Sequence, residues 1–262
     1  MSFQESLDTL PIGGVFVAFA VVALIVYEIG FRIGRWWQGR TPEEQEGPTG
    51  VLVGSLLALM AFLLAITMGM ASDRYDTRRG LVLAEANSIG TTYLRAGYLP
   101  EPVASRSQEL LREYVPLRIA VNDLGEVNVR IARSVEIQNE LWSMAEELAR
   151  STPDSDVLAL YIDALNDTID VNETRVTAGL YARVPQTVLM LLMVGSALTL
   201  GMVGYSAGLT RRRSPLTAVV MIIVLGAVIT MVVDLDRPRD GFLEVNQQPL
   251  LDLQQQVGPP SS

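Results

Sequence analysis

The feature that most constrains this chain is a proline-free run between Pro48 and Pro100 whose two halves differ in polarity. Val51–Ser72 contains no charged residue, and about 20 apolar residues are enough for a helix to cross the hydrocarbon core of a bilayer. Asp73–Ala96 is instead rich in Arg, Asp, Glu, Asn and Thr. Because no proline interrupts the run, we predict one helix of roughly 70 Å that leaves the lipid and continues into water.

The remaining sequence is typical of a membrane protein with several spans. Of the 262 residues, 49% are hydrophobic and only 19% are charged. Three further windows are free of charge and long enough to cross a bilayer: Thr9–Tyr27, Val184–Thr210 and Ser214–Val233. We therefore predict an all-α protein with four transmembrane helices in a 2+2 arrangement and a soluble helical bundle inserted between spans two and three.

The predicted domain boundaries follow these windows. Residues 1–72 form the first transmembrane pair, 73–183 the helical soluble domain, 184–233 the second transmembrane pair, and 234–262 a tail that packs on the soluble domain and whose end we expect to be disordered.

The soluble block has the apolar spacing of helices and no alternating strand pattern. One helix is predicted to begin at Thr152–Asp154, where a threonine cap precedes a proline.

Several classes of function are excluded by composition. Cysteine and histidine are absent, which excludes disulfides, thiolate and imidazole chemistry, and the usual zinc or haem sites. No pairing of a nucleophile with a base is visible, so we predict no enzyme activity, no cofactor and no metal. The net charge of −9 argues against nucleic acid as a partner.

The arginine distribution predicts an orientation. Arg32, Arg35 and Arg40 lie in the first short connector, and Arg211–Arg213 lie in the second. The positive-inside rule places both connectors in the cytoplasm, so the soluble domain and the termini would be extracytoplasmic.

The spans contain few ionisable groups, which a proton-coupled transporter would need. A passive pore needs none, since a hydrophobic constriction can gate by dewetting. Phe62, Ile66 and Met70 follow one another at i, i+4 and i+8 and are candidates for such a constriction. Packing of the same residues against lipid or neighbouring helices is an equally consistent alternative.

The polar half of the long helix contains a second candidate site. Glu85, Thr92 and Arg95 share one helical face, and Asn87 and Thr91 lie one turn apart beside it. Asn and Thr are poor helix formers on an ordinary solvated face. The group predicts either an interhelical hydrogen-bond network or the lining of a water-filled vestibule.

Charged residues also gather directly after the fourth span. Asp234, Asp236, Arg237 and Asp240 could bind a hard cation or pair among themselves and with the soluble block. Their spacing does not match a calcium loop, and arginines compete for the carboxylate oxygens. We therefore favour ion pairing.

Two of these segments carry a resemblance. Arg74–Arg79 followed by EANSIGTTYLRA, and later DLDRPRDGFLEVNQQPL (Asp234–Leu250), resemble the bestrophin-like membrane family, a bacterial and plant group with a domain of unknown function. The family is distantly similar to the bestrophin anion channels. Those channels are pentamers with four membrane helices, of which the second lines a hydrophobic neck.

The resemblance implies a bacterial inner-membrane protein that forms homo-oligomers. It places Phe62, Ile66 and Met70 at the neck by position. Bestrophins also carry an acidic calcium clasp after the last span, similar in place to Asp234, Asp236 and Asp240 but with more consecutive acids. Their soluble regions are cytosolic, which is opposite to the orientation predicted from the arginines.

We therefore expect an oligomeric ion channel-like pore in the bilayer, with anions favoured over cations as the inorganic ions that permeate it. The alternative is a non-conducting membrane scaffold or sensor whose helical domain binds a partner or a small ligand.

Overall fold

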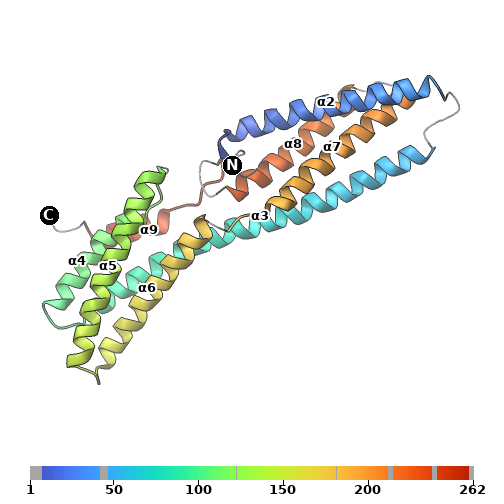
Figure 1. Ribbon diagram of the computed structural model, residues 1–262. Helices are drawn as coiled ribbons and strands as arrows, with labels where there is room; N and C mark the ends of the chain where they lie inside the picture. Colours follow the sequence, from blue (N-terminus) through green and yellow to red (C-terminus); the bar gives the residue numbers. More distant parts are fainter. Residues whose placement is uncertain are drawn as a thin grey trace. The chain divides into compact units, whose positions relative to one another are not determined.

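The computed structural model describes residues 8–41, 47–121, 123–180, 182–211, 215–237 and 241–259. In these ranges the chain forms eight α-helices and no strand (Figure 1), so the all-α prediction is confirmed. The helices are α2 (Ile12–Gln38), α3 (Gly47–Ala96), α4 (Val103–Arg118), α5 (Leu124–Ser151), α6 (Asp156–Leu180), α7 (Gln186–Leu209), α8 (Pro215–Asp236) and α9 (Gln248–Val257).

The chain divides into two compact units. The first, here called the membrane unit, comprises Met1–Arg74 and Arg183–Leu243. The second, called the polar unit, comprises Tyr75–Ala182 and Glu244–Ser262. Four helices are long and apolar enough to cross a membrane, namely α2, the Pro48–Ala96 stretch of α3, α7 and α8, as the charge-free windows predicted.

The prediction of one continuous helix between Pro48 and Pro100 is confirmed. Helix α3 has 50 residues, from Gly47 to Ala96. Pro48 lies in its first turn, where a missing N–H costs no hydrogen bond. The helix ends before Gly97, whose N–H donates to Leu94 O at 3.2 Å in a tighter closing turn.

Glycines bring α2 and α7 into close contact within the membrane unit. A Cβ built on Gly30 would lie 2.1 Å from Gly201 O, and one on Gly34 would lie 2.2 Å from Tyr205 O. The reverse holds on α7, where a Cβ on Gly204 would lie 2.2 Å from Tyr27 O. Small residues therefore let these two backbones touch, as small-xxx-small pairs do in lipid.

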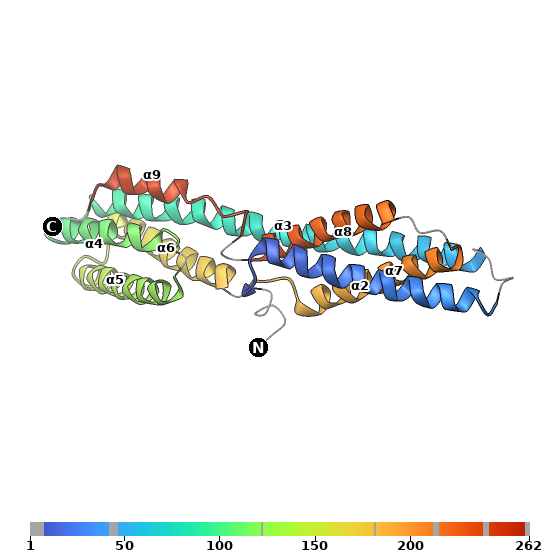
Figure 2. The ribbon, with the colours of Figure 1, turned by 90° about the horizontal axis from the view of Figure 1, so that it is seen from above.

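The core of the membrane unit is built from one face of each span. Helix α3 contributes Met60 and Leu64, which pack with buried residues of the other three helices: Phe19, Ala23, Leu192, Leu200, Ile222, Leu225 and Ile229. Figure 2 shows the four spans of this unit lying side by side.

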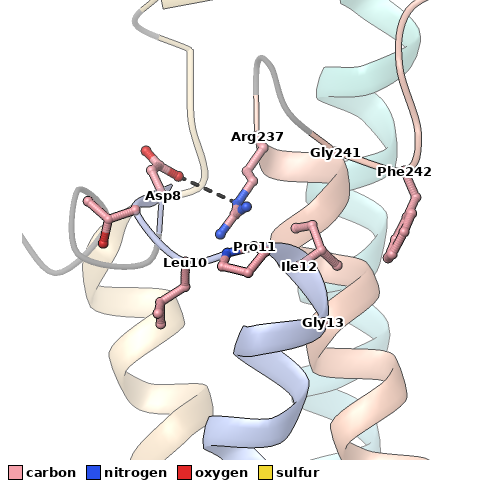
Figure 3. Close-up of a pocket in the computed structure, with 9 residues that line it drawn as sticks. Asp8, Leu10, Pro11, Ile12, Gly13, Arg237, Gly241 and Phe242 are labelled. Carbon is pink, nitrogen blue, oxygen red and sulfur yellow. Dashed lines mark ion pairs between the residues drawn. The ribbon is translucent and has the colours of Figure 1, made fainter.

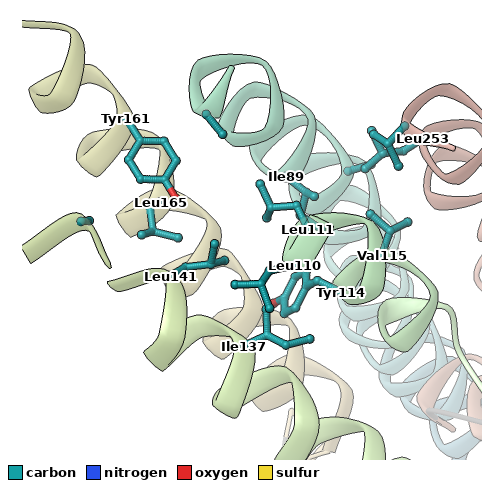
Figure 4. Packing of buried hydrophobic residues seen from close by; sticks show 14 of the residues in the cluster. Ile89, Leu110, Leu111, Tyr114, Val115, Ile137, Leu141, Tyr161, Leu165 and Leu253 are labelled. Carbon is teal, nitrogen blue, oxygen red and sulfur yellow. The ribbon is translucent and has the colours of Figure 1, made fainter. Parts of the chain in front are cut away.

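The polar unit packs α4, α5, α6 and α9 around the polar half of α3. Its core contains fully buried side chains from four helices (Figure 4), among them Ile89, Leu111, Ile137, Leu141 and Leu165. Helix α9 adds Leu250, Leu253 and Val257. The Leu253 side chain lies 3.3 Å from the position of a Cβ on Gly90, so α9 packs directly on α3.

The predicted start of a helix at Thr152–Asp154 is wrong. Thr152 instead closes α5, because its hydroxyl donates to Leu148 O at 2.8 Å. Helix α6 begins at Asp156, and the Ser155 hydroxyl accepts from Leu158 N at 3.2 Å. The capping side chain is therefore Ser155, three residues after the predicted Thr152.

Candidate functional site

The apolar half of α3 has two faces with different surroundings. Met60, Leu64, Thr67 and Ala71 are buried and lie along one side of the helix. Phe62 and Ile66 lie on the opposite side and are 62% and 46% exposed, together with exposed Gly69.

Met70 differs from the other two residues of the predicted constriction. A spacing of four residues drifts around a helix of 3.6 residues per turn, and Met70 is already half-buried. Of the predicted set, Phe62 and Ile66 therefore lie on the open face of this segment, which Leu59 and Gly69 share.

A buried carboxylate organises the polar unit. The Glu85 side chain is 0% exposed, and its Oε1 accepts from Arg118 Nε at 2.7 Å. Its second oxygen accepts from Arg175 Nη1. The two arginine side chains are themselves only 6% and 14% exposed. One negative charge thus faces two guanidinium groups away from water, where charge-assisted hydrogen bonds are strongest.

Arg175 extends this network to other elements. Its Nη1 also donates to Arg118 O at 2.9 Å, and its Nη2 donates to the Gln247 side chain at 2.8 Å. Helices α3, α4 and α6 and the residue before α9 are therefore tied at one point. Sequence reasoning selected Glu85 but missed both arginines, because nothing local distinguishes them from surface arginines of an amphipathic helix.

Arg95 lies nearly three turns further along α3 than Glu85 and contacts α6. Its Nη1 donates to Leu160 O at 2.5 Å and lies 3.4 Å from Asp163 Oδ2. The Thr92 hydroxyl lies 2.8 Å from the Thr168 hydroxyl in a fully buried contact. This part of the predicted stripe is an interhelical hydrogen-bond network.

Asn87 and Thr91 do not join that network. Both are exposed on α3, on the side where Leu83 and Leu94 are exposed as well. The predicted set of Glu85, Asn87, Thr91 and Arg95 is therefore divided between an inner face and an outer face of the same helix.

Burial also changes the acidity of groups near Glu85. Desolvation raises the pKa of Tyr114 to about 12, and Gln138 donates to its hydroxyl at 2.9 Å. On the outside of the bundle, the hydrogen bond from Arg133 holds the pKa of Glu113 below its ordinary value. Both effects favour the protonation states present at neutral pH.

The residues after the fourth span form ion pairs and backbone caps inside the membrane unit. Asp236 accepts from Val184 N at 2.6 Å and lies 3.4 Å from Arg183 Nε. Arg183 also makes a two-pronged contact with Asp8, at 2.6 and 3.0 Å. Asp234 accepts from Phe242 N at 2.8 Å and from Leu243 N at 3.1 Å.

A pocket of about 490 Å³ lies beside this cluster and is lined by the start of α2 and the chain after α8 (Figure 3). Arg237 points into it, with its Nε 3.7 Å from Asp8 Oδ1. Asp240, the fourth residue of the predicted cluster, lies outside the described residues. Within the described part of the chain, no group of three or more acidic side chains is placed to hold a metal ion.

Comparisons with known proteins agree with this architecture. A family model of the Bestrophin-like domain matches residues 14–250. No curated protein matches the chain.

Among solved structures, a point variant of a bacterial bestrophin homologue from Klebsiella pneumoniae is 13% identical, with a TM-score of 0.68 over 94% of this chain and 97% of that chain. The homologue solved by zinc phasing has a TM-score of 0.64 at 13% identity, covering 93% and 94%. A crystal structure described as a membrane protein variant has a TM-score of 0.67 at 12% identity, covering 94% and 97%. These structures share the fold, and the family match spans most of the sequence. The chain therefore belongs to the bestrophin-like family.

Proposed function

We propose that this protein is an oligomeric, anion-selective membrane pore whose constriction is lined by α3. The chain crosses the bilayer in a 2+2 arrangement, and the helices between the second and third spans form a domain in water. Family membership supports a channel, and the scarcity of ionisable groups in the spans supports passive conduction.

The observation that carries the proposal is the open face of α3. Phe62 and Ile66 are large apolar residues of α3. They lie on the side of the helix opposite Met60 and Leu64, which pack against the other spans. When several copies are arranged around an axis, this face meets the same face of the neighbouring chains. Rings of Phe62 and Ile66 then form a hydrophobic neck, to which Met70 contributes from the flank.

The polar half of α3 continues the same design. Asn87 and Thr91 offer amide and hydroxyl groups on an exposed face and would line a wider, water-filled vestibule. Glu85 and Arg95 bond to neighbouring helices on the inner face, so they hold that lining in place. Asp234 and Asp236 fix the end of α8 by accepting backbone hydrogen bonds.

The arginine-rich connectors support an orientation in which the polar unit and both termini are extracytoplasmic. Protease treatment of intact cells tests this separately from conduction. Cleavage between residues 119 and 123 in intact cells supports the orientation, and protection of this stretch until the cells are opened reverses it.

Conduction is tested with the purified full chain in planar bilayers. We expect unitary currents whose reversal potential follows the chloride gradient, and a larger unitary conductance for Phe62→Ala. Leu198→Ala removes a side chain of similar exposure on α7 and should leave the conductance unchanged. Silence from a folded oligomer under varied salt and voltage would contradict the proposal and support the non-conducting scaffold or sensor.

A further inference from the structure

Arginines and tryptophans gather where the last turns of α2 and α7 end the membrane unit. They have no part in the proposed pore. Gly34 packs on Tyr205, and Gly208 packs on the backbone of Arg35, so the two helix ends lie together. Arg211 Nε donates to the Gln38 side chain at 2.6 Å, which fixes this guanidinium beside α2. We call Arg35, Trp36, Trp37, Arg40 and Arg211 the basic collar.

We propose that the basic collar binds the headgroup of an anionic phospholipid. Arg35, Arg40 and Arg211 are exposed, and among the described residues no carboxylate pairs with any of them. Arg32, at the same end, is already neutralised by Glu28 at 2.9 Å. The collar therefore has an excess of positive charge that matches a phosphate group.

The glutamates of the neighbouring connector do not cancel this excess. The sequence of the two connectors contains two further arginines, Arg212 and Arg213, and three glutamates, Glu43, Glu44 and Glu46. Arginine therefore stays in the majority at this end of the chain.

The arginines are not needed to satisfy the helix ends. At the end of α2, Thr41 N and its hydroxyl both donate to Trp37 O, at 3.0 and 3.1 Å. At the end of α7, the Thr210 hydroxyl lies 3.3 Å from both Ser206 O and Ala207 O. The terminal carbonyls of both helices thus accept local hydrogen bonds. The guanidiniums are therefore available to bind an anionic ligand.

The apolar surface below the collar fits an acyl chain. Ile25, Ile29 and Ile33 are exposed at i, i+4 and i+8 on α2, which places them along one side of the helix. Trp36 continues that side, and the guanidinium of Arg40 lies 3.8 Å above the Trp36 ring. Tryptophan resides at the level of the headgroups, so the stacked arginine lies where a lipid phosphate is found. This order of isoleucines, tryptophan and arginine matches the order of chain, ester and phosphate in one lipid molecule.

The tryptophans allow a direct test. The chain has three, and the substitution Trp142→Phe in α5 leaves only Trp36 and Trp37 as emitters. This variant is reconstituted in phosphatidylcholine vesicles containing a minor fraction of brominated phosphatidylglycerol, or the same fraction of brominated phosphatidylcholine. Bromine quenches tryptophans in contact with it, so the ratio of the two quenching strengths reports local enrichment of the anionic lipid.

We expect stronger quenching by the brominated anionic lipid, and a weaker preference at high salt. Each arginine near a membrane surface contributes about five-fold to the affinity for anionic lipid. Arg40→Gln with Arg211→Gln should therefore lower the affinity for the anionic lipid about 25-fold, and most of the enrichment should be lost. Arg79→Gln with Arg150→Gln removes the same charge at exposed positions of the polar unit and should leave the enrichment intact.

Three outcomes would overturn the proposal. These are equal quenching by both lipids, an enrichment that survives in the Arg40→Gln/Arg211→Gln variant, and absence of quenching by either lipid. The last result would mean that another subunit covers the collar. None of these readouts depends on conduction. Lipid binding by the collar can therefore be refuted while the proposed pore is supported, and the pore can be refuted while lipid binding is supported.

Discussion

Glu85 accepts a 2.7 Å hydrogen bond from Arg118 although both side chains are almost completely removed from water. Arg175 contacts the second oxygen of the same carboxylate. Desolvating three charged groups costs several kcal/mol per ion, and the cost is offset only while all partners are present. The polar unit therefore depends on this contact more than on any exposed ion pair.

Replacing the carboxylate should destabilise the protein strongly. We expect Glu85→Gln to lower the free energy of unfolding by about 3–5 kcal/mol, because two arginines would remain buried without a counter-charge. Chemical denaturation of the full chain in detergent measures the change. Glu146→Gln breaks an exposed pair with Arg150 and should cost less than about 1 kcal/mol. Equal effects of the two substitutions would show that the Glu85 network is not structural.

The contact of α2 with α7 should not tolerate even a methyl group. Gly34→Ala places a Cβ about 2.2 Å from Tyr205 O, so the helices must separate, at a cost of about 1–3 kcal/mol. We expect a clear fall in the melting temperature of the detergent-solubilised protein. Gly54→Ala is the matched control, because its Cβ would meet nothing within 4 Å. An unchanged melting temperature for Gly34→Ala would contradict the close packing.

Asp236 has two separable roles that substitutions can divide. Asp236→Asn retains an oxygen to accept from Val184 N but loses the charge facing Arg183. Asp236→Ala loses both, so the partly buried Arg183 keeps only Asp8 and the buried Val184 N–H loses this partner. We expect the alanine variant to lose about 3–5 kcal/mol and the asparagine variant clearly less. Asp154→Ala, at an exposed loop position, serves as the control in the same melting assay, and identical losses for the two Asp236 variants would argue against the ion pair.

Tyr114 should make the polar unit sensitive to alkali. Burial raises its pKa to about 12 in the folded protein, whereas the unfolded pKa is about 10. The contribution of the neutral phenol is therefore complete below pH of about 10 and decreases as the pH rises toward about 12. Denaturation at increasing pH should show this loss, and Tyr114→Phe should reduce its slope. An identical slope in the variant would assign the loss to other groups.

The spans and the continuous α3 could be predicted because they depend on local composition. Val51–Ser72 has no charge and the run has no proline, and both properties act within the helix itself. Helical spacing assigned Glu85 and Arg95 to one polar stripe, and in the structure each bonds to a neighbouring helix. Their partners could not be found, since Arg118 and Arg175 lie 33 and 90 residues away from Glu85, and only tertiary packing brings them together.

The start of α6 was predicted at the wrong residue for a similar reason. Threonine followed by proline is a good local start signal, yet Thr152 is used to close the preceding helix. The sequence also could not show which polar residues of α3 are exposed. Asn87 and Thr91 are as polar as Thr92, yet both are exposed, whereas Thr92 is buried against Thr168 of α6.

The contact of Asp236 with Arg183 and Val184 joins the two ends of a chain segment that contains both α7 and α8. The start of α7 and the end of α8 are thereby joined by a hydrogen bond and an ion pair, so that the two helices form a closed hairpin. During biosynthesis this contact can form only after the end of α8 has left the ribosome, and it would then hold α7 and α8 together as a hairpin in the bilayer. Withdrawal of either helix by an extracting protease would first have to open this fastening.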